Sequence, residues 1–331
     1  MSAIVEKLKN RENLSFEESK VLFTELMEGK YSEASIIEIL ESFIKKGETK
    51  DELAGGIFVL RNKASRVNAH QNTIDTCGTG GDGKNSLNIS TAAAIVLASM
   101  GIKVAKHGNK AVSSNCGSAD VLEALEININ LKPNEAEDSL NKVNFAFMFA
   151  PNYHSAMKHV GPARKKMGKK TIFNLIGPLS SPAQVKRQVV GVFDKKWMKP
   201  FAEALRENKV EHAYIVHSED GMDEISPFAK TNIVELNQNN LNEFTIDPIK
   251  LGINAKNYNN LKGKNAKYNA LKIIEIYKGL INEFSYAVAL NAAAGLIVSG
   301  NQQNFEDAYY KALDHLKTGN VFQYLNKIRS I

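Results

Sequence analysis

The feature that most constrains the fold is a glycine-rich segment, Asp75–Ser86, which follows a short predicted strand and leads into a helix predicted to start near Ser90. Its glycines are Gly78, Gly80, Gly81 and Gly83. Such a run lets backbone N–H groups converge on an anion, and the dipole of the following helix favours negative charge at the same place. A strand, a glycine loop and a helix in this order predict an α/β fold with a phosphate site at the loop.

Two nucleotide-binding patterns also match this loop. Gly78, Gly80 and Gly83 satisfy G-x-G-x-x-G, but no Asp or Glu stands about 20 residues further on, where a dinucleotide site needs one for the ribose. The run from Gly78 to Lys84 satisfies G-x-x-x-x-G-K, but Asn85 replaces the Ser or Thr that would bind magnesium. A tight turn without a ligand is the remaining alternative. The sequence favours phosphate binding over each of these.

The first 66 residues and the rest of the chain differ in the spacing of their apolar residues. The first 66 residues predict helices only, with capping boxes at Ser15–Glu18 and Thr49–Glu52 and a further helix from about Ser32 to Gly47. From Asn72 onward, short apolar runs alternate with helical patterns. This alternation predicts an α/β region with a mostly parallel central sheet. The predicted strands are Thr73–Asp75, Lys103–Ala105, Phe145–Phe149 and Ala213–Val216.

A second polar loop, Lys106–Ser114, follows the strand at Lys103–Ala105. It offers a cation, an amide and hydroxyl groups at the edge of the sheet where open α/β folds bind ligands. A helix begins after it near Ser118, whose hydroxyl is predicted to cap that helix or to bind phosphate. Ser90 and Thr91 start the helix after the glycine loop, and we expect one to serve as its N-cap and the other to contact the ligand.

An acidic turn, Asp220–Ser226, follows the strand at Ala213–Val216. Its adjacent carboxylates, Asp223 and Glu224, suit a hard cation such as magnesium, which takes few protein ligands and relies on phosphates and water. An isolated Asp-Glu pair would more often be an exposed acidic turn.

Charge is distributed unevenly along the chain. The net charge is +6, yet no Asp or Glu occurs between Asp138 and Asp194. A solvated lysine-rich face, an anionic ligand and nucleic acid are the possible reasons for such a basic stretch. Few aromatic residues are interleaved with the basic run Lys165–Lys170, which disfavours nucleic acid.

The chain has two cysteines, Cys77 and Cys116, at a spacing that suits neither a disulfide framework nor a metal site. Two cysteines without a disulfide framework fit a protein of a reducing compartment. The N-terminal residues lack the apolar core of a secretory signal, and the longest apolar runs are too short for a bilayer. We expect a cytoplasmic protein.

Four segments together resemble the successive signature blocks of the anthranilate phosphoribosyltransferases. They are Asp75–Thr91, Lys106–Leu125, Phe149–Ala183 and Asp220–Ser226. The resemblance implies a small all-helical domain, a larger α/β domain, a hinge between them and a homodimer formed through the helical domain. It places the helical domain at residues 1–66, joined by helices from about 152–184, and the α/β domain at 67–151 and 185–331.

The resemblance also implies roles for individual residues. The positions implied to bind phosphoribosyl pyrophosphate are Gly78, Gly81, Asp82, Ser86, Asn88, Ile89, Ser90, Thr91, Lys106, His107, Gly108, Asn109, Lys110, Ala111, Val112, Ser113, Ser114 and Ser118. Anthranilate would contact Gly78, Asn109 and Arg164, and the Arg164 guanidinium can hold a carboxylate as a planar fork. Magnesium, with two ions implied, would be held by Ser90, Asp223 and Glu224.

Four positions depart from the family pattern. Lys110 stands where arginine is usual, Asn115 where lysine is common, Glu126 where glycine is common and Ser155 where proline is common. None of them removes a matched ligand-binding position, but Lys110 and Asn115 are expected to alter phosphate affinity.

The reaction implied is displacement of pyrophosphate from the ribose by the anthranilate amine, a step of tryptophan biosynthesis. An arylamine is neutral at pH 7, so His107, His154 and His159 are interpreted as structural or pocket-lining residues, with the alternative that one accepts the released proton. The rival hypotheses are a pyrimidine nucleoside phosphorylase and a nucleic-acid-binding relative of the same fold. The expected partners are small-molecule substrates, with no membrane and no nucleic acid.

Overall fold

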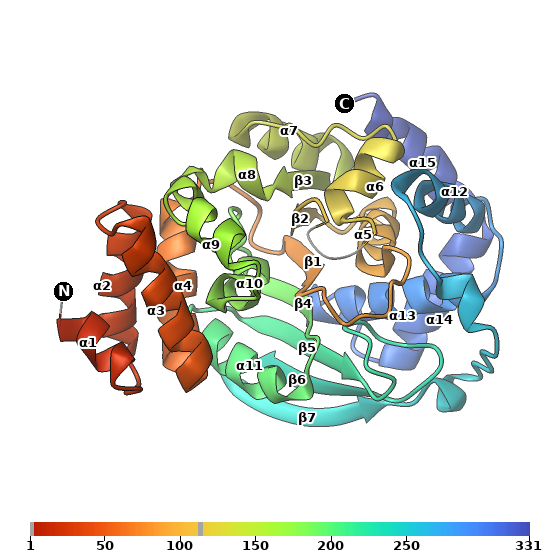
Figure 1. Ribbon diagram of the computed structural model, residues 1–331. Coiled ribbons are helices and arrows are strands. Elements are labelled where there is room, and N and C mark those ends of the chain that lie inside the picture. The colour runs from red at the N-terminus through yellow and green to blue at the C-terminus, as the bar shows by residue number, and fades with distance from the viewer. Residues whose placement is uncertain (1–2, 112–114) are drawn as a thin grey trace.

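The computed structural model describes residues 3–111 and 115–331, and Figure 1 shows a helical part packed beside a larger α/β part. The helical part begins with α1 (Ala3–Lys9), α2 (Phe16–Met27), α3 (Glu33–Lys46) and α4 (Lys50–Lys63). Both predicted capping boxes are present, at Ser15 with Glu18 and at Thr49 with Glu52. Helix α3 is capped by Ser32 and ends at Gly47, as its sequence predicts.

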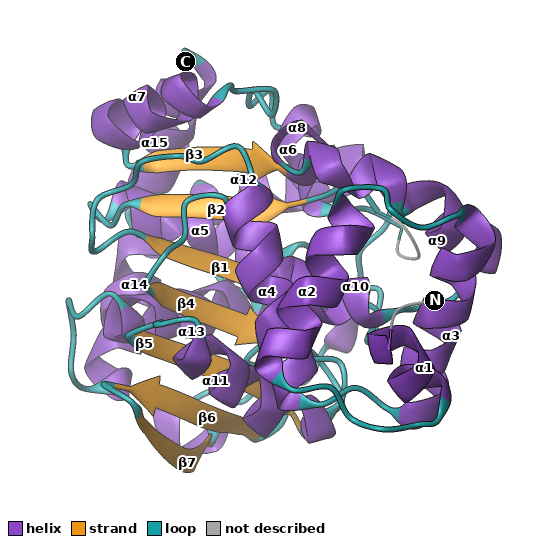
Figure 2. Cartoon of the chain, turned by 90° about the vertical axis from the view of Figure 1, so that its left-hand side faces the viewer, coloured by secondary structure: helices purple, strands orange, loops and turns teal. Residues whose placement is uncertain are grey.

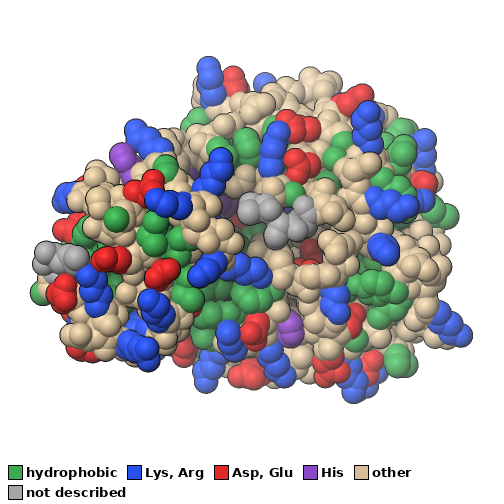
Figure 3. Space-filling model, in the orientation of Figure 1, with side chains coloured by type: hydrophobic (Ala, Val, Ile, Leu, Met, Phe, Trp, Pro, Cys, Tyr) green, Lys and Arg blue, Asp and Glu red, His purple; other side chains and the backbone are tan. Residues whose placement is uncertain are grey.

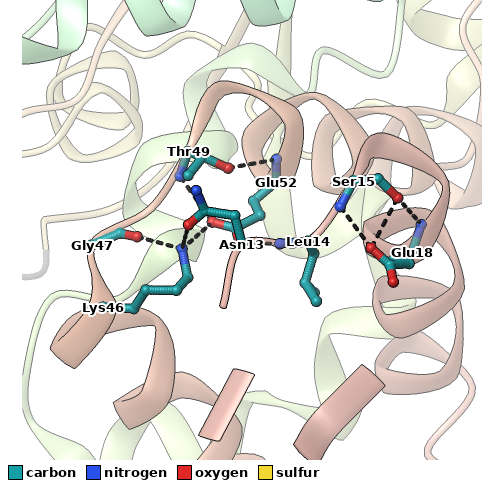
Figure 4. A network of polar contacts seen from close by, with 8 residues as sticks. All are labelled: Asn13, Leu14, Ser15, Glu18, Lys46, Gly47, Thr49 and Glu52. Atoms are coloured by element: carbon teal, nitrogen blue, oxygen red, sulfur yellow. Dashed lines mark hydrogen bonds and ion pairs between the residues drawn. The ribbon is translucent and has the colours of Figure 1, made fainter. Parts of the chain in front are cut away.

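A buried carboxylate organises the turns between these helices. Glu52 accepts hydrogen bonds from the backbone N–H of Leu14 at 2.9 Å and of Thr49 at 2.8 Å. Its Oε2 also lies 2.9 Å from Nζ of Lys46 (Figure 4). Glu52 is fully buried, so these partners offset the cost of removing its charge from water. One side chain thereby joins the loop before α2 to both ends of the α3–α4 turn.

A seven-stranded sheet forms the centre of the larger part, and its strand order is β3-β2-β1-β4-β5-β6-β7. The first five strands in chain order are parallel, and β6 and β7 are added antiparallel at one edge. The predicted mostly parallel sheet is therefore confirmed. The strands are β1 (Ile74–Gly78), β2 (Val104–Gly108), β3 (Phe145–Phe149), β4 (Arg187–Gly191), β5 (His212–Ser218), β6 (Thr231–Asn237) and β7 (Asn240–Ile246).

Helices cover both faces of this sheet (Figure 2). The remaining α-helices are α5 (Ile89–Ser99), α6 (Ser118–Ala124), α7 (Pro133–Val143), α8 (Ala150–Tyr153), α9 (Gly161–Met167), α10 (Ile172–Ile176), α11 (Met198–Glu207), α12 (Ala266–Tyr277), α13 (Glu283–Val298), α14 (Phe305–Lys317) and α15 (Asn320–Arg329). Short 3₁₀ turns are η1 (Ser155–His159), η2 (Gly177–Leu179), η3 (Lys195–Trp197), η4 (Pro248–Leu251) and η5 (Tyr258–Leu261).

The largest apolar core lies around α5 and α13. Both helices are apolar and almost fully buried, and they pack against each other. A Cβ atom at Gly295 of α13 would lie 2.4 Å from Cδ1 of Leu97 on α5, so the close approach of the two helices depends on this glycine. This packing fixes the position of α5, whose N-terminus lies at the end of the glycine loop.

A second core joins the helical part to the sheet. It contains side chains of α2, α3 and α4 together with those of α10, α11 and β5. Helix α9 packs on α3, and α10 packs on both α3 and α4, so this later segment of the chain lies with the N-terminal helices. Within residues 3–111 and 115–331, no helix combines the length and apolar character that a membrane crossing demands.

Candidate functional site

The carboxyl ends of the parallel strands bring the predicted loops together. The glycine loop leaves β1 after Gly78, the second polar loop leaves β2 after Gly108, and the acidic turn leaves β5 after Ser218. Because parallel strands end at one edge of a sheet, these segments meet there. Figure 3 shows acidic side chains inside a hollow near the middle of this face, with basic side chains beside it.

Asp223 fastens the glycine loop to the acidic turn. Its Oδ2 accepts a hydrogen bond from the backbone N–H of Gly80 at 2.8 Å, and its own N–H donates to Oδ2 of Asp82 at 3.4 Å. The approach is close: a Cβ atom at Gly78 would lie 2.8 Å from Oδ2 of Asp223. A Cβ atom at Gly191 would lie 1.6 Å from the Asp223 carbonyl oxygen. Two glycines therefore make room for this one aspartate.

Glu224 closes the N-terminus of α5. The backbone N–H of Ser90 donates to Oε1 of Glu224 at 3.1 Å. The N-cap position belongs to Asn88, whose side chain makes no capping hydrogen bond. The prediction that Ser90 or Thr91 caps this helix is therefore wrong, because both lie inside it and the cap comes from a distant carboxylate. Ile89 and Thr91 are buried, whereas Ser90 is half-buried.

Burial and neighbouring carboxylates disfavour ionisation of the two acidic side chains. Burial, and then the neighbouring Asp82, raises the pKa of Asp223 to about 7. Burial, and then Asp223, raises the pKa of Glu224 to about 8. A cation would relieve this repulsion, and carboxylate and hydroxyl oxygens are ligands that magnesium prefers. Among the described residues, no three His, Cys, Asp or Glu side chains group closely enough to hold a metal by themselves. These oxygens fit an ion whose remaining ligands are phosphate and water.

Lys106 supplies a buried positive charge next to these carboxylates. Its side chain is only 2% exposed, and Nζ donates to the carbonyl oxygen of Thr76 and lies 3.5 Å from Oγ of Ser90. Burial lowers the pKa of Lys106, while the carboxylates of Asp75 and Glu224 oppose that change. The lysine therefore faces the glycine loop from inside the protein.

The second polar loop is held by the start of α6. Oδ2 of Asp120 accepts from the backbone N–H groups of Ala111 at 2.9 Å and of Gly117 at 2.7 Å. Ser118 donates to the carbonyl oxygen of Asn109 at 3.2 Å, so it links the two ends of the loop. The Asn109 side chain is exposed, and its Oδ1 accepts a hydrogen bond from the backbone N–H of Lys110 at 2.8 Å. The predicted phosphate contacts Val112, Ser113 and Ser114 lie outside the described residues.

Asn88 connects the start of α5 to the second polar loop and to helix α12. Its Nδ2 donates to the carbonyl oxygen of Cys116 at 3.1 Å, and its Oδ1 accepts from Nδ2 of Asn269 at 2.9 Å. Asn269 on α12 is buried and was not singled out in the sequence. Ser86 forms an isolated antiparallel bridge with Lys262. The start of α5 is thereby anchored from three directions.

Arg164 lies on α9, in the segment that packs with the helical part. Its guanidinium carbon is 5.3 Å from the centre of the Phe173 ring, and burial lowers its pKa. The contacts of the described residues do not join Arg164 directly to the glycine loop. Lys170, six residues further along, does reach it: Nζ donates to the carbonyl oxygen of Gly81 at 3.0 Å. No pattern in the sequence pointed to that contact.

The histidines considered in the sequence are largely enclosed. The rings of His107 and His154 lie 5.1 Å apart, and both are buried. Burial lowers the pKa of His154 to about 4 and that of His107 well below its ordinary value, so both are neutral at pH 7. His159 packs on Gly29 of the helical part, where an added Cβ atom would lie 2.6 Å from Nδ1. This position gives His159 a packing role.

Two of the departures from the family pattern have a structural context. Lys110 forms a 2.9 Å ion pair with Glu123 on α6, and this pairing raises its pKa. Glu126, just after α6, has φ of +62°, in the left-handed region that favours glycine. Asn115 and Ser155 are exposed.

Comparison with known proteins identifies the class first. A family model described as "Glycosyl transferase family, helical bundle domain" matches residues 2–64, and one described as "Glycosyl transferase family, a/b domain" matches residues 70–322. The two matched regions are the helical bundle and the α/β part that carries the converging loops. The chain is therefore a member of this glycosyl transferase family.

Individual relatives narrow the class. The chain is 58% identical over 331 residues to the anthranilate phosphoribosyltransferase of Pelagibacter ubique, covering 100% of both chains. It superimposes on the crystal structure of the Thermus thermophilus enzyme of that name with a TM-score of 0.93 and 34% identity, covering 99% of each chain. The Saccharomyces cerevisiae enzyme in complex with PRPP and Mg gives a TM-score of 0.85 at 25% identity, covering 96% of this chain and 93% of that one. The chain belongs to the anthranilate phosphoribosyltransferase family.

Proposed function

We propose that this chain transfers the phosphoribosyl group of 5-phosphoribosyl 1-pyrophosphate to anthranilate, giving N-(5-phosphoribosyl)anthranilate and pyrophosphate in tryptophan biosynthesis. The observation that carries the proposal is the junction of three loops. Asp223 binds the glycine loop, Glu224 binds the start of α5, and buried Lys106 lies against both. Full-length similarity to enzymes of this name supports the same reaction.

The phosphates of the donor would lie against the glycine loop and the N-terminus of α5. There the backbone N–H groups and the charge of Lys106 would stabilise the departing pyrophosphate. Ser86, Asn88, Ser118 and the described part of the second loop would complete this site. In the transfer, the amine nitrogen bonds to C1 of the ribose, the bond from C1 to the pyrophosphate oxygen breaks with its electron pair, and the nitrogen loses a proton.

Magnesium fits the oxygen ligands of Ser90, Asp223 and Glu224, and we propose two ions. When bound, the metal would neutralise charge on the leaving pyrophosphate. The yeast structure that holds PRPP and Mg supports this choice of metal. Before the metal binds, the protein's own contribution is to hold two neighbouring carboxyl groups in one turn, with Asp223 buried and Glu224 half-buried.

Anthranilate would lie between the donor and α9, with its carboxylate toward Arg164 and its ring near Asn109 and Gly78. The neutral rings of His107 and His154 would enclose this region and exclude water. The stretch without acidic residues between Asp138 and Asp194 supports this placement, because a carboxylate substrate would meet no like charge there.

Three further parts of the proposal concern the whole molecule. The functional domains would be residues 1–66 with about 152–184, and 67–151 with 185–331. A homodimer would form through the helical domain, whose helices expose the apolar side chains of Val21, Ile44 and Phe58. A cytoplasmic location would keep both cysteines reduced, and both are buried and free of disulfides.

One assay tests the activity directly. Purified protein is mixed with anthranilate, and the loss of its fluorescence is followed with and without phosphoribosyl pyrophosphate and magnesium. We expect loss that requires both additions and a product of the mass of phosphoribosylanthranilate. Turnover of a nucleoside with phosphate, or no turnover of anthranilate by folded protein, would contradict the proposal. Light scattering of the wild type and of Phe58→Glu tests the dimer separately.

A further inference from the structure

Two neighbouring residues of the glycine loop are held from opposite sides. Gly80 is bound through its N–H by Asp223, which belongs to the acidic turn of the α/β part. Gly81 is bound through its carbonyl oxygen by Nζ of Lys170, at 3.0 Å. Lys170 lies between α9 and α10, in the segment packed on the N-terminal helices. The loop is thus fastened to both parts of the molecule at adjacent residues.

The Lys170 ammonium group has a second partner at the same place. It lies 3.9 Å from the centre of the Phe193 ring, which follows β4. The backbone N–H of Phe193 in turn donates to Oγ1 of Thr79 in the glycine loop at 3.0 Å. A cation over an aromatic face is attracted by the ring quadrupole, so the ring fixes the ammonium group beneath the loop. Lys170, Phe193 and Thr79 form one continuous set of contacts.

The loop needs such external support because it has little of its own. Gly80, Gly81 and Gly83 all have positive φ, at +61°, +73° and +75°. This backbone carries no side chains at these positions, and glycine loses more conformational freedom than any other residue when it is ordered. A Cβ atom at Gly81 would lie 2.5 Å from Nζ of Lys170, so the lysine lies directly against the loop.

We infer that Lys170 is a positioning residue, which fixes the glycine loop for the sugar donor and links its placement to the segment that carries Arg164. The inference rests on the proposed function, since it assigns the donor to this loop and the acceptor to Arg164. Lys170 lies six residues after Arg164 on the same short segment. A movement of α9 on acceptor binding would therefore be transmitted through Lys170 to the peptide group of Gly81.

The variants that test this role differ in what they retain. Lys170→Ala removes both contacts, Lys170→Met keeps the chain length without the charge, and Lys170→Arg keeps a cation and a donor. Phe193→Leu removes the ring and keeps apolar bulk. Lys169→Ala is the matched control, because Lys169 is an exposed neighbour with the same charge. Each protein is assayed for kcat and for KM of both substrates, and its melting temperature is measured.

We expect Lys170→Ala and Lys170→Met to raise KM for phosphoribosyl pyrophosphate roughly threefold to tenfold, as suits one charged hydrogen bond and one partly exposed cation–π contact. Lys170→Arg should recover most of the loss, and Lys169→Ala should match the wild type. Phe193→Leu and Lys170→Ala should be less than additive in combination, since they remove a shared contact. Melting temperatures should stay close to that of the wild type.

A calorimetric titration measures the link between the glycine loop and the segment that carries Arg164. Phosphoribosyl pyrophosphate is titrated in magnesium-free buffer, with and without saturating anthranilate. In the wild type, the affinity for phosphoribosyl pyrophosphate should differ between the titrations with and without anthranilate. In Lys170→Ala this difference should be smaller. The inference is overturned if Lys170→Ala has the same donor KM as Lys169→Ala. It is also overturned if all Lys170 variants, arginine included, lose activity together with melting temperature. Absence of turnover in the wild type would instead refute the proposed function.

Discussion

The backbone N–H of Ser90 donates to Oε1 of Glu224 at 3.1 Å, so that a carboxylate 134 residues away in the chain caps helix α5. The same carboxylate is one of the proposed magnesium ligands. The carboxyl oxygen of Glu224 accepts a hydrogen bond from an N–H group that has no partner within the helix, so the two are joined before any ligand arrives. The start of the helix and the acidic turn are therefore held together by a group that is also a proposed metal ligand.

The acidic pair provides the most direct test of the metal assignment. Asp223→Asn with Glu224→Gln keeps both shapes and most hydrogen-bond acceptors, so the fold should persist. Activity should fall by at least roughly a hundredfold, because the ligands that hold magnesium lose their charge. Magnesium titration of kcat/KM checks this. Near-normal activity at limiting magnesium would show that the metal is held elsewhere.

Arg164 is expected to act on the acceptor. In Arg164→Ala, KM for anthranilate should rise roughly tenfold to a hundredfold, the equivalent of a charge-assisted hydrogen bond of about 1.5–3 kcal/mol. KM for phosphoribosyl pyrophosphate should change far less. Arg164→Lys keeps the charge but loses the planar fork. Its KM for anthranilate should lie between those of the wild type and Arg164→Ala. Equal changes for both substrates would assign Arg164 a structural role, such as its contact with Phe173.

Gly191 is the residue at which a single methyl group should be least tolerated. Its Cβ atom would lie 1.6 Å from the backbone carbonyl oxygen of Asp223, and backbone cannot move aside cheaply. We expect Gly191→Ala to lower the free energy of unfolding by about 3 kcal/mol and to displace the acidic turn. Gly177→Ala is the control, since nothing lies within 4 Å of an added Cβ there. Urea unfolding of the two variants compares them, and similar stability would contradict the geometry.

Glu126 offers a gain in stability. Its φ of +62° strains a residue with a side chain, so Glu126→Gly should raise the free energy of unfolding by about 1 kcal/mol. Its side chain is mostly exposed and lies 3.7 Å from Arg329, a pair that contributes little. Asn144→Gly is the comparison, because asparagine tolerates its φ of +54° better. An equal gain in both variants, or a loss in Glu126→Gly, would mean that backbone strain at Glu126 is not the cause.

Buried His154 should make the fold sensitive to acid. Its pKa is about 4 in the folded protein and about 6.5 in the unfolded chain, so the unfolded chain binds the extra proton between these values. Stability therefore rises with pH through that window and falls as pH drops from about 6.5 toward 4. His154→Gln should reduce this slope, with unfolding measured by urea at several pH values. If the dependence of stability on pH is unchanged in His154→Gln, the neighbouring His107 would be the group responsible for the acid sensitivity.

The sequence predicted the local parts of the fold well and the long-range parts less well. Both capping boxes and strand Phe145–Phe149 were predicted correctly, because each depends on residues close together in the chain. Strands β1 and β2 extend beyond their predicted ends through Cys77 and His107. These polar or small residues continue the strands because they pair with residues of the neighbouring strands, Cys77 with Val190 and His107 with Met148. Strand β4 was not named, since its apolar run is only two residues long.

The residues of the proposed site could be suggested from the sequence, but the contacts between them could not. Gly80 and Asp223 are 143 residues apart, and nothing in either segment shows that one binds the other. The error at Ser90 and Thr91 has the same origin, because a distant carboxylate replaced the local cap. Lys170 looked like one lysine among several in a basic run. Only its place beneath Gly81 distinguishes it from Lys169.

The two edges of the sheet differ in a way that bears on association between chains. Strand β3 ends the sheet on one side, is mostly buried and packs with α7 and α8. Strand β7 ends it on the other, and most of its residues are exposed and polar, including Asn242, Glu243 and Thr245. An open strand edge is a template for pairing with another chain, and charged and polar side chains weaken that pairing. The antiparallel hairpin added after the parallel core thus gives the sheet a hydrophilic border, which limits aggregation during folding, when the parallel strands are still incomplete.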